Sequence, residues 1–289
     1  MTARSTRVFL VLLAALALAA CSRIASMSAM LAYSNATPLL SWMVGDYVEL
    51  EGAQKAWVHA RFDRAMAWHR ENELPRYRRF LASASESLQE PVSAREVGDA
   101  WAEMRGSYDR VVEHVLPDVA DFLLALDAEQ LGHLERAFAK ANRKVVKEGA
   151  HGTPEERRSK SIAKAIEHFE EWTGPLTESQ RAIVAAHRAA FPDTSAERLA
   201  DRKYRQAQTL ALVRAGDRAA TIAGLRRLLV DPDASRSPAY VAKLRARDAL
   251  AFEMIAQVSA TLSTEQRGHL RGRIGEYMAD ITRLAEAGD

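Results

Sequence analysis

The chain contains 289 residues, of which 48% are hydrophobic and 27% are charged, with 40 Lys and Arg residues against 38 Asp and Glu residues. Arg4 and Arg7 are the only charged residues among the first 20, so the rest of the chain has 38 basic residues (40 − 2) and 38 acidic ones. This balance excludes the basic excess with which proteins bind nucleic acid. The frequent Ala, Leu, Arg and Glu residues favour helices.

Residues 1–20 have the pattern of a secretory signal peptide. Arg4 and Arg7 precede an apolar run of 13 residues from Val8 to Ala20. At 1.5 Å per residue this run is about 20 Å long, whereas a membrane-spanning helix must cross about 30 Å of hydrocarbon. We therefore expect residues 1–20 to be a signal peptide that is removed on export.

The motif Leu18-Ala19-Ala20-Cys21 contains the only cysteine of the chain and resembles the lipobox of bacterial lipoproteins. The resemblance implies cleavage before Cys21, which would carry a diacylglycerol and an N-acyl chain, more than stable anchoring needs. Ser22 stands where Asp would retain a lipoprotein in the inner membrane, which implies the outer membrane and a body that faces the periplasm. The alternative is an ordinary signal peptide with a coincidental cysteine.

A segment without charged side chains, Ile24 to Gly45, makes up most of the expected lipidated N-terminus and juxtamembrane segment, residues 21–45. The sequence favours a short helix around Leu39 to Val44. Two interpretations of the segment remain. It packs on the body of the protein, or it lies in the membrane interface with Trp42 at the level of the lipid headgroups.

Residues 46–289 lack the alternating pattern of β-strands and contain repeated signals for helix starts. The signals are S/T-x-x-E capping boxes and prolines at first helical positions: Ser93–Glu96, Thr153–Glu156, Thr194–Glu197, Leu116-Pro117 and Ser237-Pro238. We therefore predict an all-α, multi-helix bundle of roughly nine to eleven antiparallel helices. We expect residues 46–289 to form one helical domain, with a subdivision near residues 149–153 as the alternative.

A leucine followed four residues later by a glutamine recurs at expected helix starts: Leu50–Gln54, Leu126–Gln130, Leu176–Gln180 and Leu262–Gln266. In the structural interpretation, Asp127, Thr177 and Ser263 cap helices and the glutamines complete capping boxes. The alternative is a resemblance to the Leu-Thr-x-x-Gln motif of Spy- and CpxP-like periplasmic chaperones, all-helical proteins that bind partly unfolded clients. Only Leu176–Gln180 matches that motif literally, and the unequal spacing of the four stretches argues against a tandem repeat.

A second motif runs from Trp68 to Pro75, with Tyr77 after it. Together with the lipobox it resembles an uncharacterised family of proteobacterial lipoproteins, a resemblance that implies an exported helical protein and no particular activity. The local spacing predicts an i,i+4 pair between His69 and Glu73 and the end of a helix at Pro75.

Trp57 and Trp68 are eleven residues apart and therefore about 20° from the same face of one helix, with Arg61 between them. One interpretation is a corner between two helices that aromatic side chains hold together. The other is a binding surface formed by Trp57, Arg61, Trp68 and Tyr77, in which the arginine stacks on an aromatic ring.

The sequence contains eight histidines, but no spacing typical of a metal site and no nucleophile or phosphate-binding motif. We expect no catalytic residue, no metal site and no cofactor beyond the acyl chains on Cys21. The predicted function is a non-enzymatic interaction or structural role at the Gram-negative cell envelope, with the membrane and envelope proteins as partners. The alternatives are a chaperone-like or stress-related binder of unfolded envelope proteins and a carrier with an enclosed apolar pocket.

Overall fold

The computed structural model describes residues 33–149 and 152–286, and these residues form α-helices and one short 3-10 helix without a β-strand. The predicted all-α fold is therefore confirmed. The predicted signal peptide and Cys21 lie outside the described residues, as do residues 150–151 of the predicted subdivision. The elements are α3 (Ala36–Gly45), α4 (Gly52–Asn72), α5 (Leu74–Ser87), α6 (Ala94–Leu124), α7 (Ala128–Gly149), α8 (Pro154–Thr173), α9 (Glu178–Ala189), α10 (Ser195–Ala215), α11 (Arg218–Leu229), η1 (Pro232–Ser235), α12 (Pro238–Ala260) and α13 (Thr264–Glu286).

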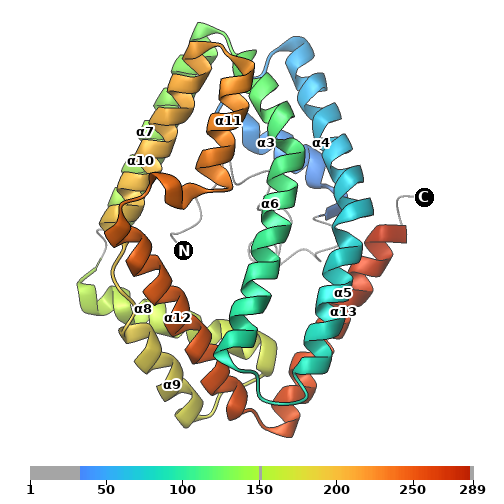
Figure 1. Ribbon diagram of the computed structural model, residues 1–289, viewed down its shortest axis with the longest axis vertical. Coiled ribbons are helices and arrows are strands. Elements are labelled where there is room, and N and C mark those ends of the chain that lie inside the picture. The colour runs from blue at the N-terminus through green and yellow to red at the C-terminus, as the bar shows by residue number, and fades with distance from the viewer. Residues whose placement is uncertain (1–32, 150–151, 287–289) are drawn as a thin grey trace.

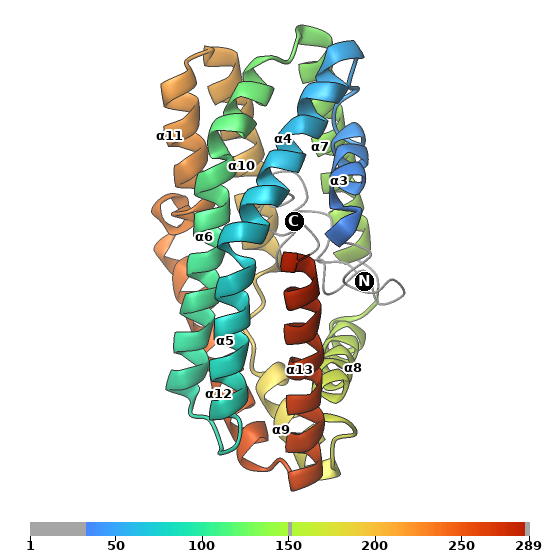
Figure 2. The same cartoon turned by 90° about the vertical axis from the view of Figure 1, so that its right-hand side faces the viewer.

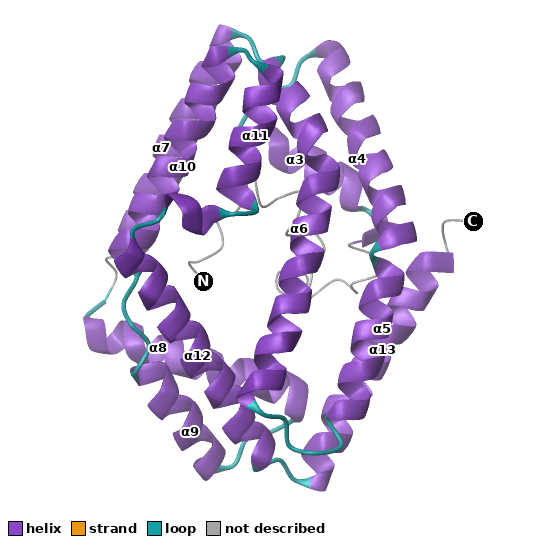
Figure 3. Cartoon of the chain, viewed as in Figure 1, coloured by secondary structure: helices purple, strands orange, loops and turns teal. Residues whose placement is uncertain are grey.

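Helix α6 runs from the lower to the upper part of the molecule (Figure 1) and contacts α4, α10, α11 and α12. Its 31 residues correspond to a length of about 46 Å. The helix begins at the predicted capping box, where the N–H of Ser93 donates to the Glu96 carboxylate at 2.7 Å and the N–H of Glu96 donates to the Ser93 hydroxyl at 3.3 Å. Short loops connect the described helices (Figure 3). The successive pairs α3–α4, α8–α9 and α10–α11 pack against each other, whereas α6 packs on α11 and α12, and α13 packs on α5.

The buried apolar side chains form separate groups in the two halves of the molecule. In the upper half, Leu116 and Leu123 of α6 pack with Leu134 of α7 and Leu225 of α11. In the lower half, the group comprises Leu176, Val184, Met254 and Val258, which bring α9 and α12 together. A third group, which includes Leu40 and Phe62, joins α3 to α4. Because the upper groups do not merge with the lower one, the long helices and the contacts at their ends must hold the halves together.

Of the three predicted S/T-x-x-E caps, those at Ser93 and Thr153 are confirmed and the one at Thr194 is wrong. Thr153 accepts from the N–H of Glu156 at the start of α8. At Thr194 the prediction is wrong, because its side chain makes no capping hydrogen bond. The carboxylate of Asp193 instead accepts from the N–H of Ser195 at 2.8 Å, and Glu197 forms an ion pair with Lys243 of α12. A neighbouring carboxylate and a long-range ion pair thus replace the predicted local cap.

Pro117 lies inside α6 and not at a helix start, so that prediction is also wrong. A proline within a helix lacks the N–H that would bond the carbonyl four residues earlier and costs about 3 kcal/mol. The residues around it, Val115, Leu116 and Ala120, are each at most 5% exposed. Burial of one such Val or Leu side chain contributes about 1.5–3 kcal/mol, so the packing of this turn outweighs the cost of the proline. At Ser237-Pro238 the predicted helix start is confirmed.

The predicted caps in the leucine–glutamine motifs are confirmed. The N–H groups of Gln130, Gln180 and Gln266 donate to the side chains of Asp127, Thr177 and Ser263, respectively, at 2.8, 3.3 and 3.1 Å. Each glutamine Oε1 accepts in return from the N–H of its capping residue at 2.9–3.2 Å. Each cap satisfies N–H groups that the first turn of a helix leaves without a partner.

The four motif glutamines also pair with one another, which the sequence analysis did not predict. Gln54 and Gln130 exchange amide hydrogen bonds of 3.1 and 2.6 Å, and Gln180 and Gln266 exchange bonds of 2.9 and 3.0 Å. One pair joins the starts of α4 and α7 at the top of Figure 1, and the other joins the starts of α9 and α13 at the bottom. We call these the upper and lower glutamine pairs.

The second N–H of most of these amides also has a partner. Nε2 of Gln130 donates to the Glu49 carbonyl at 2.8 Å, Nε2 of Gln180 to the Thr261 carbonyl at 3.0 Å and Nε2 of Gln266 to the Pro175 carbonyl at 2.8 Å. Gln130, Gln180 and Gln266 therefore each close their own helix start and also bind the loop before the partner helix. The pairs link segments that are 76 and 86 residues apart.

Helix α3 packs against α4 through Ala36, Leu40 and Val44, which are 3%, 1% and 8% exposed. For residues 36–45 the structure therefore shows packing on the body, one of the two interpretations of the uncharged segment. Trp42 lies on the outer side of the same helix with 66% of its surface exposed. No helix within the described ranges is both long enough and apolar enough to cross a membrane.

Replacing Gln180 by Ala should lower the free energy of unfolding by about 2 kcal/mol. The change removes a cap and leaves buried polar groups of the α13 start without partners, and these losses cost about 1 kcal/mol and about 1–3 kcal/mol, respectively. Urea denaturation monitored by circular dichroism measures the effect.

The exposed Gln208 of α10 provides the matched control, because Gln208→Ala should change stability by less than about 0.5 kcal/mol. The double variant Q180A/Q266A should lose less stability than the sum of the two single variants, with a coupling of at least about 0.5 kcal/mol. Strict additivity would contradict the pairing.

Candidate functional site

The junction of α4 and α5 gathers the residues of the Trp68–Tyr77 motif. Helix α4 ends at Asn72, and α5 begins at Leu74 with Pro75 in its first turn. The predicted helix end at this proline is therefore confirmed. Glu73 lies between the two helices, where its N–H still donates to the His69 carbonyl at 2.9 Å and its carbonyl accepts from the N–H of Tyr77 at 2.9 Å. We call this junction the α4–α5 bend.

The Glu73 side chain is 1% exposed and forms a two-pronged ion pair with Arg110 of α6. Nε and Nη2 of Arg110 donate to the two carboxylate oxygens at 2.8 and 2.9 Å, and Nη2 also donates to the hydroxyl of Ser107 at 2.8 Å. The hydrogen bonds to Glu73 raise the pKa of Arg110 further above its ordinary value. A buried carboxylate requires such a partner, because its desolvation otherwise costs several kcal/mol.

His69 lies beside this ion pair and is 6% exposed. Its Nδ1 is 2.9 Å from the hydroxyl of Tyr33, and its Nε2 is 3.4 Å from the hydroxyl of Tyr77. Burial lowers the pKa of His69 to about 4, and burial raises the pKa values of both tyrosines. At neutral pH all three groups are uncharged, so the imidazole donates to one hydroxyl and accepts from the other.

The sequence predicted a side-chain pair between His69 and Glu73. In the structure the hydrogen bonds of the two side chains go to other partners. Glu73 bonds Arg110, which is 37 residues away, and His69 contacts Tyr33, which is 36 residues away. Neither partner was singled out from the sequence. An arginine within a charge-rich helix and a tyrosine before α3 give no local signal that they meet a buried carboxylate or imidazole.

Three of the four predicted binding residues lie along the seam between α4 and α6. The guanidinium of Arg61 lies 4.7 Å from the centre of the Trp57 ring, and its Nε is 3.4 Å from the carboxylate of Asp118. The ring of Trp68 stacks on His114 with 4.0 Å between ring centres. The predicted arginine–aromatic stacking is thus present within α4, and the ion pair of Arg61 with Asp118 connects α4 to α6.

Tyr77 lies apart from that seam, at the α4–α5 bend beside His69. The structure therefore does not gather Trp57, Arg61, Trp68 and Tyr77 around one point. All four side chains are only partly exposed.

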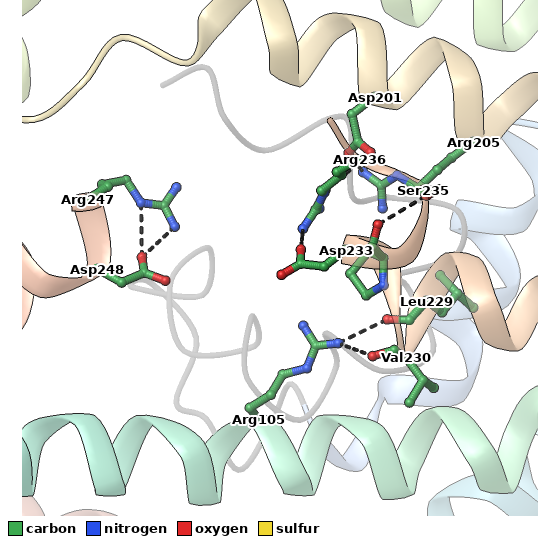
Figure 4. Close-up of polar contacts among 11 residues, drawn as sticks. Arg105, Asp201, Arg205, Leu229, Val230, Asp233, Ser235, Arg236, Arg247 and Asp248 are labelled. Carbon is green, nitrogen blue, oxygen red and sulfur yellow. Dashed lines mark hydrogen bonds and ion pairs between the residues drawn. The ribbon is translucent and has the colours of Figure 1, made fainter. Parts of the chain in front are cut away.

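A second polar cluster fixes η1 between α6 and α10 (Figure 4). Arg105 of α6 donates to the carbonyls of Leu229 and Val230 at 3.2 and 2.8 Å. Asp201 of α10 forms ion pairs with Arg205 at 3.0 Å and with Arg236 at 3.4 Å, and Arg236 also binds Asp233. Asp109 also pairs with Arg105 at 3.0 Å, so three carboxylates face the three arginines of this cluster, which holds the chain between α11 and α12.

An open groove of about 480 Å³ lies between α7 and α10, and its lining residues are Ala139, Asn142, Arg143, Val146, Lys147 and Lys203. The volume falls in the range of ligand pockets, but such pockets bury most of the ligand and are mainly apolar. This groove is open and half of its lining residues carry positive charge, so it differs from the enclosed apolar pocket that a carrier would need.

Metal-ligating side chains do not gather in threes anywhere in residues 33–149 and 152–286. The neighbouring pairs His59–Asp63 and His168–Glu171 are present at 3.5 and 3.1 Å on exposed helix faces. They are single contacts on solvated surfaces.

A family model described as a family of unknown function, DUF6279, matches residues 46–241. The matched region begins after α3 and contains the whole α4–α5 bend, with Glu73 and Arg110. No curated protein matches the chain. No solved structure matches it either.

Replacing Arg110 by Met should destabilise the protein by about 3–5 kcal/mol, because the buried carboxylate of Glu73 would lose its charged partner. Adding Glu73→Gln in the same chain removes the uncompensated charge and should restore a large part of this loss. Chemical denaturation at neutral pH measures both variants. If the double variant were no more stable than Arg110→Met alone, the ion pair would not be what the bend depends on.

The stability of the protein should fall between pH 6.5 and pH 4. The pKa of His69 is about 4 in the folded protein and 6.5 in its ordinary state, so the unfolded chain binds more protons in this window. The contribution of His69 is complete above pH 6.5 and disappears as the pH falls to 4, a change of about 3 kcal/mol.

In His69→Gln this part of the pH dependence should be absent from the unfolding free energies measured across that window. His168→Gln on the exposed face of α8 serves as the control. In this variant the unfolding free energy should change with pH as it does in the unmodified protein. Equal slopes in His69→Gln and in the unmodified protein would show that His69 is not buried in neutral form.

Proposed function

The chain belongs to DUF6279, a family of unknown function, and we propose that it is a lipid-anchored helical protein of the Gram-negative outer membrane. In this proposal its body faces the periplasm and has an interaction or structural role without catalysis. Membership of an uncharacterised family agrees with the resemblance found for the Trp68–Tyr77 motif. The sequence Leu18-Ala19-Ala20-Cys21 supports the anchor, and Ser22 supports the outer membrane.

The observation that carries the proposal is the attachment of Tyr33 to the body. The Tyr33 hydroxyl contacts His69 inside the α4–α5 bend, only 12 residues after Cys21 (33 − 21). Twelve residues of fully extended chain span at most about 40–43 Å. An acylated Cys21 would therefore hold the helical body next to the bilayer, as expected of a protein whose role depends on that position.

The chemistry of the bend supports a structural role for its ionisable groups. Glu73 is fully engaged by Arg110 and Ser107 lies in the same network, while His69 is uncharged at neutral pH and contacts two tyrosine hydroxyls. Groups arranged in this way join α4, α5, α6 and the segment before α3. A catalytic group would instead require access for a substrate.

The chaperone-like alternative rests on the Leu176–Gln180 motif, and the motif is engaged within the fold. Leu176 is 6% exposed and Gln180 is 1% exposed, and Gln180 belongs to the lower glutamine pair. The motif is thus used for capping and for joining helices. Suppression of client aggregation by stoichiometric amounts of the protein would nevertheless favour the alternative over the proposed role.

Replacing Cys21 by Ala should move the protein from the membrane fraction to the soluble periplasmic fraction after a salt wash, because the acyl chains would be lost. Incorporation of a labelled fatty acid should disappear in the same variant. Cell fractionation followed by immunodetection measures the distribution. Retention of Cys21→Ala in the washed membranes would contradict the anchor.

Ser22→Asp provides a matched test of the outer membrane, because it keeps Cys21 and changes only the following residue. This variant should stay lipidated and move to the inner membrane, whereas Ser22→Ala should behave like the unmodified protein. Density-gradient separation of the two membranes distinguishes these results. An unchanged position of Ser22→Asp would contradict sorting by this residue.

A further inference from the structure

Helix α3 presents an apolar outer side that has no charged residue. The inner side, formed by Ala36, Leu40 and Val44, is buried against α4. On the outer side, Leu39 is 39% exposed and Trp42 is 66% exposed. Residues 36–45 contain no Asp, Glu, Lys or Arg. An exposed tryptophan on an uncharged helix is typical of segments that lie at the level of lipid headgroups.

Positive charge is concentrated in two stretches of the chain that we call the basic stretches, residues 136–149 of α7 and residues 154–164 of α8. Together they contain nine Lys and Arg residues (5 + 4) and three Glu residues (1 + 2). All nine basic side chains are exposed, among them Lys147 of α7 and the adjacent Arg157 and Arg158 of α8. The chain from Cys21 onward has no net charge, so this excess is local to the two stretches.

The apolar helix and the basic stretches lie on the same long side of the molecule. Figure 2 shows α3 and α8 along the right-hand edge, whereas α6 and α11 lie along the left-hand edge. The end of α7 is next to α8, since only residues 150–153 separate the two helices. Tyr33, the first described contact of the segment that begins at Cys21, directly precedes α3.

We propose that this side of the molecule docks on a phospholipid bilayer, with Trp42 and Leu39 of α3 at the level of the headgroups and the basic stretches of α7 and α8 against anionic phospholipids. The proposal deepens the proposed function and rests on its lipid anchor. The anchor and α3 are on one short piece of chain, which favours the bilayer over a protein as the occupant of this side. Basic residues next to an anionic surface add attraction that falls with ionic strength.

The docking is tested with the chain from Cys21 onward, whose only cysteine is coupled to a maleimide lipid in vesicles of phosphatidylcholine and phosphatidylglycerol. Coupling replaces the natural acyl chains, so this experiment does not depend on lipidation in the cell. Half of the vesicles contain phospholipids with brominated acyl chains, which quench tryptophan fluorescence at short range. The quenched fraction is compared in the unmodified chain, in Trp42→Phe and in Trp101→Phe. Trp101 is 48% exposed and belongs to α6, which lies along the opposite edge of Figure 2.

The expected result is quenching of the unmodified chain that is largely lost in Trp42→Phe and retained in Trp101→Phe. Equal quenching of the unmodified chain and Trp42→Phe, or no quenching of either, would overturn the docking of α3. Circular dichroism of each variant excludes unfolding as the cause. A failed docking experiment together with a membrane-bound protein that Cys21→Ala releases would reject this inference and leave the anchor intact.

A second experiment tests the basic stretches with Cys21→Ser. This variant cannot be coupled to lipid, so its binding to vesicles depends on the protein surface alone. Arg157→Glu with Arg158→Glu should weaken binding to vesicles that contain phosphatidylglycerol by at least about tenfold. The matched control changes another adjacent and exposed pair, Arg78 and Arg79 of α5, to Glu and should have a much smaller effect. Equal losses in the two double variants, or equal binding to vesicles of phosphatidylcholine alone, would overturn the role of the basic stretches.

Discussion

The reciprocal bonds between glutamine amides are the constraint on which the arrangement of helices depends. Each paired amide must bond its own helix start and its partner at the same time, so Gln54 and Gln130 fix two helix starts relative to each other at one end, and Gln180 and Gln266 do so at the other. A buried amide without these partners would cost about 1–3 kcal/mol. The pairs therefore specify which helix ends meet, while the three apolar groups supply stabilising burial.

The same glutamines show which parts of the fold are encoded locally. Their capping bonds follow from a spacing of three residues within one turn, and the sequence predicted these caps and the all-α class correctly. Their pairing joins residues 76 and 86 positions apart, and no local pattern contains that information. Pro117 and Thr194 illustrate the opposite error, because local preferences predicted helix starts or caps there that buried packing and a nearby carboxylate override.

For the α4–α5 bend, too, the local features were predictable from the sequence and the long-range contacts were not. The motif located the α4–α5 bend and its proline, since a proline limits the residue before it and ends a helix by local sterics. The burial of Glu73 was not predictable, because it depends on Arg110 from another helix. In the same way, the stacking of Trp68 on His114 and the contact of His69 with Tyr33 depend on how α4 meets α6 and the segment before α3. The local sequence thus identified the α4–α5 bend, and tertiary contacts determine the protonation and hydrogen bonding of its side chains.

The contact between Tyr33 and His69 connects this chemistry to the proposed position of the protein. Burial lowers the pKa of His69 to about 4 and so keeps the imidazole uncharged at neutral pH, where one ring nitrogen accepts from a tyrosine hydroxyl and the other donates. Only 12 positions of the sequence (33 − 21) separate Cys21 from this contact. An anchor at Cys21 with so short a connection would restrict the rotation of the body above a bilayer, and α3 directly follows the attached Tyr33. A surface with an exposed tryptophan and local positive charge on the side of α3 therefore gains far more from contact with lipid than the same surface would gain on the opposite side.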